Sequence, residues 1–359
     1  MLKCHLKKKL QTICAEYEIK AQNASLEATG HGFKIIKEKE GVTVDYDKTV
    51  EQLYAYVTEK WNKKANIKLT ATTTVSKPKY TTEDCEKVSN EPMGSYTTEF
   101  SVGSSYANRN LNIQNGAKLI NGAVVYPGEQ YSCNENLYPW TEDNGWHPAG
   151  TYVDGGVQDS LGGGICQVSS TLYNALLRAE IKVVKRFPHS MAVGYVPLSA
   201  DAALAGDYKD LVFENDTDAP IYVQGIYNSG GSITFNIYGH DTRKAGHSVK
   251  YESKTVKTTP VKTQTKKDSS KPVGYSEVES SGHVGYVAEL WKITYENGKQ
   301  VSKELIHTST YAMSPTIVVK GTKKASTTTK KDDSDKDDKK SSEKTTKKST
   351  SSKKSKKSE

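Results

Sequence analysis

The chain has 359 residues, which is enough for two or three domains of ordinary size. Its formal net charge of +8 comes from one end, because Gly321 to Glu359 hold 14 lysines and 7 acidic residues. The rest carries 36 basic against 35 acidic residues, which excludes an extended basic surface, and we expect no nucleic-acid partner.

Residues 1–93 are predicted to form a small α+β unit. Helices are expected over 2–17 and 46–60, and strands over 33–36, 41–44 and 67–71. The first 20 residues lack the apolar core of a signal peptide, and no apolar run in the chain is long enough to cross a bilayer. This unit contains no pattern typical of a catalytic site.

A second unit is expected over residues 99–240. A helix is predicted at 113–120 with Asn110 or Asn112 as its N-cap, followed by a strand at 124–126. A long polar loop with Trp140 and Trp146 comes next, and such loops often form functional sites. Strand patterns at 191–196, 210–214, 221–227 and 233–238 complete the unit.

The most informative stretch is the glycine run at 162–164, which precedes a helical pattern and places Cys166 at or next to a helix N-terminus. The unpaired N–H groups and the dipole of a helix start favour a thiolate, the nucleophilic form of cysteine. A buried structural cysteine is the alternative. The chain contains five cysteines without C-x-x-C spacing, so neither a metal site nor a disulfide framework is indicated, and no cofactor is expected: Cys4, Cys14, Cys85, Cys133 and Cys166.

A thiolate nucleophile usually needs a histidine partner that a third group orients. His189 is the first candidate, because a base on a strand after the cysteine helix is the order found in papain-like sites; His147 is the reserve. A histidine that caps a turn beside Pro188 is the alternative. Asp201, Asp210 or a backbone carbonyl is available as the third group, and sequence does not choose among them.

The remaining site candidates surround the cysteine. Backbone N–H groups at the helix start are expected to form an oxyanion hole, to which the Gln167 amide is able to contribute. The charged candidates lie beside turns and suit a carboxylate-bearing substrate, with surface ion pairs as the alternative. The residues expected to bind substrate are Arg109, Asp154, Gly164, Gln167 and Arg186.

The last third of the chain is predicted to be a linker, a small β module and a tail. Residues 250–271 are Lys- and Thr-rich and are expected to be an extended linker. Glycines punctuate alternating segments at 301–307 and 317–320, which favours a β module over 272–322. The tail, 323–359, is almost wholly Lys, Ser, Thr, Asp and Glu and is expected to be disordered.

Several motifs together resemble the VanW family. They include Asn108-Arg109, Pro127-Gly128-Glu129, the stretch Gly-Gly-Gly-Ile-Cys-Gln-Val-Ser-Ser-Thr-Leu-Tyr-Asn at 162–174, His189-Ser190 and Tyr195-Val196-Pro197. Residues 1–93 resemble part of the peptidoglycan-binding domain that often precedes VanW, and 272–322 resemble a G-five domain. The fold class expected is α+β, with a mixed α/β VanW-type domain and a β-rich C-terminal module.

The resemblance implies a surface protein of a Gram-positive bacterium that acts on peptidoglycan stem peptides and glycan. Some clostridial members are regarded as L,D-transpeptidases, and this implies Cys166, His189 and Asp201 as catalytic residues. The alternative hypothesis is a non-catalytic peptidoglycan-binding or adhesion protein associated with glycopeptide resistance.

The sequence departs from the family's pattern at three places. An aromatic is usual where Cys133 stands, and a glycine is common near Ser199. Members are exported through an N-terminal signal or membrane anchor that is absent from this sequence, so we expect the natural start to lie upstream of Met1.

Overall fold

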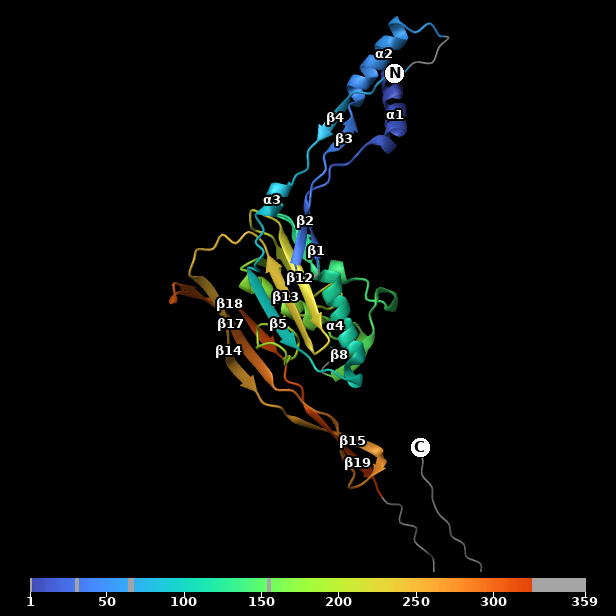
Figure 1. Ribbon diagram of the computed structural model, residues 1–359. Coiled ribbons are helices and arrows are strands. Elements are labelled where there is room, and N and C mark those ends of the chain that lie inside the picture. Colours follow the sequence, from blue (N-terminus) through green and yellow to red (C-terminus); the bar gives the residue numbers. More distant parts are fainter. Residues whose placement is uncertain (1, 30–31, 64–67, 154–155, 325–359) are drawn as a thin grey trace, which may run out of the picture.

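The computed structural model describes residues 2–29, 32–63, 68–153 and 156–324. The molecule is elongated, with the N-terminal helices at one end, a helix-covered sheet in the middle and the last strands at the other end (Figure 1). Asp154 and the tail from residue 325 on lie outside the described residues. The expected combination of helices and strands with a β-rich C-terminal region is confirmed.

The N-terminal unit follows the predicted order of elements closely. It contains α1 (Leu2–Cys14), η1 (Ala15–Tyr17), β1 (Ser25–Thr29), β2 (Gly32–Ile36), β3 (Gly41–Val44), α2 (Tyr46–Glu59), β4 (Thr73–Ser76) and α3 (Thr82–Glu86). Asp45 caps α2 by accepting a hydrogen bond from Lys48 N at 3.0 Å. The strand expected over 67–71 is wrong in position: residues 68–72 are irregular, and the strand that pairs with β3 is β4.

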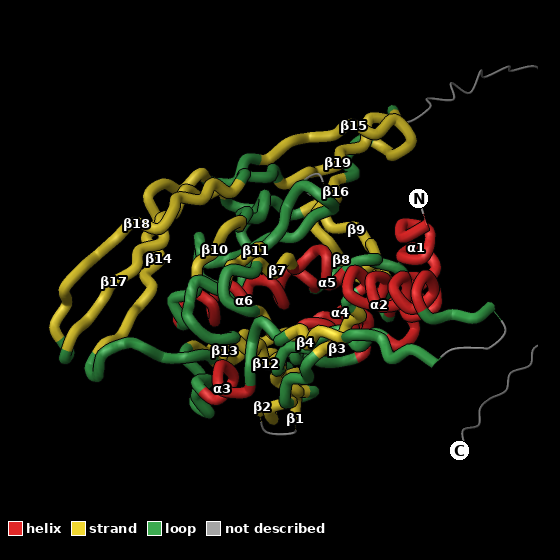
Figure 2. The backbone as a smooth tube through the Cα atoms, turned by 90° about the horizontal axis from the view of Figure 1, so that it is seen from above, coloured by secondary structure: helices red, strands yellow, loops and turns green. Residues whose placement is uncertain are grey.

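The central domain is built on a four-stranded antiparallel sheet in the order β5-β13-β12-β6. Helices α4 and α6 pack on it, and smaller strands and a hairpin flank them, as Figure 2 shows from above. The elements are β5 (Gly94–Glu99), η2 (Ser104–Tyr106), α4 (Ala107–Ile120), β6 (Ala123–Val125), β7 (Gln130–Ser132), α5 (Cys133–Leu137), η3 (Glu142–Asn144), β8 (Pro148–Val153), β9 (Gly156–Leu161), α6 (Ile165–Arg178), β10 (Lys182–Lys185), β11 (Val212–Glu214), β12 (Ile221–Asn228) and β13 (Ser232–Tyr238).

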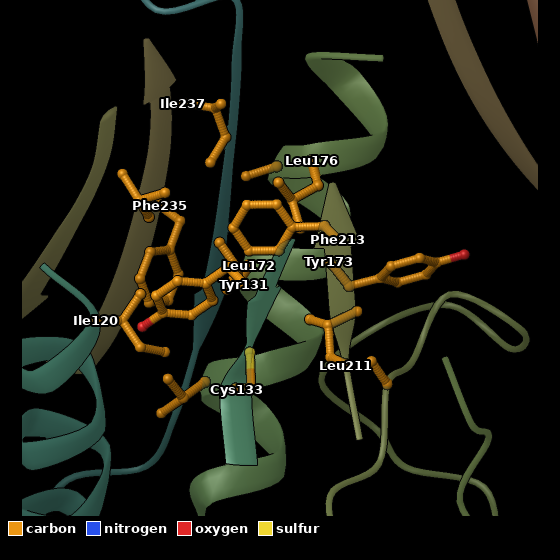
Figure 3. Close-up of a cluster of buried hydrophobic side chains, with 14 of the residues drawn as sticks. Ile120, Tyr131, Cys133, Leu172, Tyr173, Leu176, Leu211, Phe213, Phe235 and Ile237 are labelled. Carbon is orange, nitrogen blue, oxygen red and sulfur yellow. The ribbon is translucent and has the colours of Figure 1, made fainter. Parts of the chain in front are cut away.

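Successive side chains of a strand point to opposite faces of a sheet, and here both faces are covered by other elements. Ile221, Val223 and Phe235 are fully buried in the main core with the apolar face of α6, whereas Tyr222 packs under β1 and β2. Figure 3 shows this main core, with Leu172 and other side chains of α6 facing the strands. Helix α6 is therefore held rigidly, and its first turn with it.

Two expectations for this domain are wrong. Helix α4 begins at Ala107 and not after Asn110 or Asn112, which are buried inside it and bond to Ser101 O and to the backbone at His147 and Gly163. The segment 191–196 is irregular rather than a strand. The alternating apolar residues that suggested a strand here include Met191, Val193 and Tyr195, which line a cavity described below.

The C-terminal strands form two sheets, in the orders β14-β17-β18 and β15-β19-β16. Their bounds are β14 (His247–Thr259), β15 (Thr263–Pro272), β16 (Ser276–Ser280), β17 (Gly285–Glu296), β18 (Lys299–Tyr311) and β19 (Thr316–Lys323). The expected linker, 250–271, is therefore wrong: most of it belongs to β14 and β15. These strands are mostly exposed, so their sequence lacks the apolar alternation of a half-buried strand.

Candidate active site

Cys166 is the second residue of α6, and Gly164 is the N-cap of that helix. Gly164 has φ +106°, a conformation that side chains disfavour, and the turn it makes brings the chain from β9 into the helix. A Cβ at this position would lie 3.0 Å from Arg109 Cγ. The predicted position of the cysteine at a helix start therefore agrees with the structure.

The Gly164→Ala variant tests how strictly this turn needs glycine. We expect a loss of about 2 kcal/mol in the free energy of unfolding, because the strained backbone and the contact with Arg109 act together. The melting temperature should fall accordingly. Gly194→Ala is the matched control, since a Cβ there would meet nothing within 4 Å; equal melting temperatures for the two variants would contradict the argument.

His189 and Asp201 lie next to the cysteine. The His189 Nδ1 atom is 2.6 Å from Asp201 Oδ2, and the same oxygen accepts a hydrogen bond from the backbone N of His189 at 2.7 Å. The Cys166 thiol lies 3.4 Å from both Leu204 O and Leu204 N, and the imidazole is near enough to change its pKa. Asp210 instead accepts from Ser132 Oγ and Asn134 N, so the structure places Asp201, and not Asp210, on the imidazole.

Cys166, His189 and Asp201 shift one another's pKa values, so that the two acids become more acidic and the histidine more basic. Burial alone would raise the pKa of the Cys166 thiol, but the hydrogen bond and the charge of His189 outweigh it and lower the pKa. Burial likewise opposes protonation of His189, yet Asp201 and Cys166 raise its pKa to about 9. The pKa of Asp201 falls to about 2, because His189 and Arg186 overcome the effect of burial. These directions are those expected for a thiolate–imidazolium pair beside a carboxylate.

The two buried cysteines, Cys85 and Cys133, differ from the half-buried Cys166. Burial raises the pKa of Cys85 to about 11, and it also raises the pKa of Cys133, which lies in the main core. Cys4 is exposed and Cys14 half-buried in the N-terminal unit. Among the described residues, Cys166 alone combines a lowered thiol pKa with a place in the wall of a cavity.

This contrast predicts the pH dependence of alkylation. Cys166 should react with iodoacetamide at pH 6, well below the pKa of about 8.5 of a free cysteine. In the His189→Ala variant the burial remains without the stabilising charge, so the rate at pH 6 should fall at least about tenfold. Peptide mapping in a Cys4→Ser, Cys14→Ser background measures the rate at Cys166. An unchanged rate in His189→Ala would contradict the ion pair.

The backbone at the helix start offers a donor for a negatively charged oxygen. The N–H groups of Ile165 and Gln167 bond to Gly162 O and Gly164 O, whereas that of Cys166 makes no hydrogen bond within the described residues. The Gln167 amide does not contribute as the sequence suggested. It is buried and donates to Thr98 Oγ1 and Glu99 O, and its oxygen accepts from Arg109.

Cys166 and His189 open into a cavity of about 880 Å³. Arg109 and Lys209 also line it, together with Trp140 and the hairpin of β8 and β9, and no acidic side chain is among its described lining residues. Of the residues expected to bind substrate, Arg109, Gly164 and Gln167 line this cavity, and Asp154 lies outside the described residues. The cavity wall thus contains two cationic side chains together with the cysteine.

Arg186 does not line the cavity. Its side chain is 8% exposed, and the guanidinium donates to Asp201 O at 2.5 Å and to Asp201 Oδ1 at 2.7 Å. It is therefore a buried partner of the carboxylate, and not a substrate contact in this structure. The sequence alone does not show whether a charged residue such as Arg186 is buried or exposed.

Two tyrosines of the site were not among the sequence candidates. The Tyr195 hydroxyl lies 3.4 Å from His189 Nε2, and burial raises the pKa of Tyr195 well above its ordinary value, so the hydroxyl stays neutral. Tyr311, from β18, donates to Asp201 Oδ1 at 2.5 Å. Tyr195 lies in the Tyr-Val-Pro motif and was within reach of sequence reasoning, whereas nothing in the sequence signals Tyr311.

No cluster of three or more His, Cys, Asp and Glu side chains suited to a metal ion occurs in the described ranges. Within the same residues, no helix is both long enough and apolar enough to cross a membrane.

Three family models match the chain. Residues 108–238 match the model described as "VanW like protein", residues 250–323 the "G5 domain" and residues 3–66 the "Putative peptidoglycan binding domain". The resemblance stated from the motifs is confirmed, and the G5 match begins within β14, inside the segment expected as a linker.

Two curated relatives and one solved structure are similar to parts of the chain. The uncharacterized protein YoaR of Bacillus subtilis (strain 168) is 37% identical over 164 residues, which cover 46% of this chain and 53% of the relative. The vancomycin B-type resistance protein VanW of Enterococcus faecalis (strain ATCC 700802 / V583) is 28% identical over 116 residues, 31% of this chain and 42% of the relative. The chain thus spans about half the length of these relatives. The G5 domain of IgA1 protease is 30% identical with a TM-score of 0.18, covering 23% of this chain and 96% of that one.

Proposed function

We propose that this chain, which joins a VanW-like domain to a G5 domain, is a cell-wall acyltransferase of the L,D-transpeptidase type. The observation that carries the proposal is the pair of His189 Nδ1 and Asp201 Oδ2 at 2.6 Å, with His189 and the Cys166 thiol together in the wall of one cavity. A buried structural cysteine would have no need of a charged partner and a carboxylate behind it.

In the first half of the reaction, the Cys166 thiolate attacks the carbonyl carbon of the third residue of a stem tetrapeptide. The carbonyl oxygen becomes negative and is stabilised by the backbone N–H of Cys166 at the start of α6. The His189 imidazolium then gives its proton to the nitrogen of the terminal D-alanine. The C–N bond breaks, D-alanine leaves and a thioester remains on Cys166.

In the second half, the amine of a neighbouring stem attacks the thioester. Neutral His189 takes the proton from this amine, the C–S bond breaks and the thiolate returns. Asp201 stabilises the imidazolium each time it forms and holds the ring in place through Nδ1. The products are one new amide between two stems and the regenerated thiolate–imidazolium pair.

Charge in the cavity supports a substrate that carries carboxylates. Arg109 and Lys209 lie in its wall, and Trp140 adds an apolar surface. Stem peptides carry carboxylates at the D-alanine end and, in many bacteria, on the third residue. The peptidoglycan-binding and G5 matches on either side support an extracytoplasmic wall protein.

The test is to incubate the full chain with disaccharide-tetrapeptide and to follow D-alanine and cross-linked dimer by mass spectrometry. We expect both products with the wild type and neither with Cys166→Ala. Cys133→Ala is the control that removes a buried thiol outside the cavity. If Cys166→Ala gives the same products as the wild type, the catalytic proposal is wrong; if neither protein reacts but both bind the muropeptide, the domain is a wall-binding module.

A further inference from the structure

The G5 domain reaches the candidate active site through alternate residues of β18. His307, Ser309 and Tyr311 are two positions apart, so they share one face of the strand. Ser309 is 1% and Tyr311 2% exposed, whereas Thr308 and Thr310 between them are exposed. This face is packed on the VanW-like domain.

Tyr311 and Ser309 bond to the groups that surround the Asp201 carboxylate. The Tyr311 hydroxyl donates to Asp201 Oδ1 at 2.5 Å and accepts from Ser199 N at 2.7 Å. Ser309 Oγ accepts from Arg186 Nη1 at 2.9 Å and lies 2.8 Å from Ser199 Oγ. One face of a strand more than 100 residues away in sequence therefore supplies a hydrogen bond to one oxygen of this carboxylate and further bonds to Ser199 and Arg186 beside it.

The contacts from Tyr311 and Ser309 also fix the backbone at Ser199. It has φ +67°, is fully buried and lies two residues before Asp201. A left-handed conformation costs a non-glycine residue about 1 kcal/mol and persists when its surroundings fix it. Here the partners that fix its N–H and its hydroxyl both come from the G5 domain.

Two further contacts continue the same surface. Ala312 N donates to Ser190 O at 2.7 Å, directly after His189, and residues 312–314 line the cavity beside Cys166. His307 lies 3.5 Å from the Tyr173 hydroxyl, which points away from the main core in Figure 3. The G5 domain thus contacts the site from the helix to the cavity wall.

We infer that the G5 domain is part of the active site, with Tyr311 as the residue that positions Asp201 on His189. This inference rests on the proposed cysteine chemistry. A freely tethered wall anchor would need no hydrogen bond to a buried carboxylate of another domain. The VanW-like domain is then fully competent only with β18 docked, so wall ligands that move the G5 domain change the rate of the chemistry.

The test compares Tyr311→Phe with the wild type in the full chain. Phenylalanine keeps the buried ring and removes only the hydroxyl, so kcat for D-alanine release should fall about tenfold while KM stays the same, since a misplaced base slows chemistry rather than binding. The lost O–H dipole leaves more negative charge on Asp201. The acid limb of Cys166 alkylation by iodoacetamide should therefore move to higher pH by about half a unit.

Controls separate this role from a general loss of stability. Tyr295→Phe removes a hydroxyl from the far end of the same sheet and should change neither quantity. Ser309→Ala removes the partner of Arg186 Nη1 and of Ser199 Oγ, so it should also lower kcat, and it serves as the second variant if Tyr311→Phe folds poorly. If both variants keep the wild-type kcat and alkylation profile, the inference is wrong. If Cys166→Ala keeps the wild-type turnover, the proposed function is wrong. The alkylation profile of Tyr311→Phe still tests whether Tyr311 acts on the Cys166–His189–Asp201 site.

Discussion

Asp201→Asn is expected to lower kcat by about three to four orders of magnitude, the cost of replacing the carboxylate of a nucleophile–histidine–aspartate site. The reason lies in the bond between His189 Nδ1 and Asp201 Oδ2 at 2.6 Å. Asparagine carries no charge to stabilise the imidazolium, and its amide group, turned toward the ring, favours the wrong tautomer. The measurement is D-alanine release from disaccharide-tetrapeptide at neutral pH.

Asp207→Asn is the matched control, because Asp207 is exposed in the same region of the chain and does not line the cavity. The Cys166 alkylation profile gives a second readout: without the carboxylate, the pKa of His189 should fall from about 9, and the thiolate should lose its partner at neutral pH. An Asp201→Asn protein that folds and keeps more than about a tenth of the wild-type kcat would contradict the assigned role.

The central part of the site followed from sequence because its signals are local. The glycine run and the apolar period of α6 predict where Cys166 sits, since a backbone at φ +106° needs glycine at 164. His189 was the first candidate from its place after the cysteine helix, and the family resemblance implied Asp201 as its partner. Chemistry alone left His147, Asp210 and a carbonyl open, because pairing between loops depends on tertiary contacts that no spacing encodes.

What sequence did not reveal is mostly a matter of burial. Arg186 reads as a charged residue beside a turn, and only the fold shows that its side chain is 8% exposed against Asp201. Strands β14 and β15 are mostly exposed, so their Lys and Thr residues resemble a linker, and backbone pairing alone marks them as strands. Tyr311 is beyond local reasoning altogether, since its partner lies in another domain.

Arg186→Met is expected to cost about 3–5 kcal/mol of folding free energy at pH 7, the usual result of removing one member of a buried ion pair. Methionine fills much of the space but removes the guanidinium that donates to Asp201 O, Asp201 Oδ1 and Ser199 O. Lys185→Met is the control, because Lys185 is adjacent in sequence and exposed. The melting temperature by calorimetry measures the loss.

The stability loss in Arg186→Met should depend on pH, and the pKa of Asp201 gives the direction. The pKa of Asp201 is about 2 in the folded protein, so its ionised form contributes stability above the unfolded pKa of about 3.9, and that contribution disappears as pH falls toward 2. In Arg186→Met the buried carboxylate has lost one of its two cationic partners, and protonation of Asp201 relieves that cost. The difference in melting temperature between wild type and variant should therefore narrow below about pH 4.

The double variant Arg186→Met, Asp201→Asn should recover part of the stability, since it removes both charges instead of stranding one. A loss in Arg186→Met that is equal at pH 3 and pH 7, and that the double variant does not reduce, would show that Arg186 acts through packing alone. Recovery of stability without recovery of D-alanine release is the expected combination, because the carboxylate that makes the arginine necessary is the one that His189 needs.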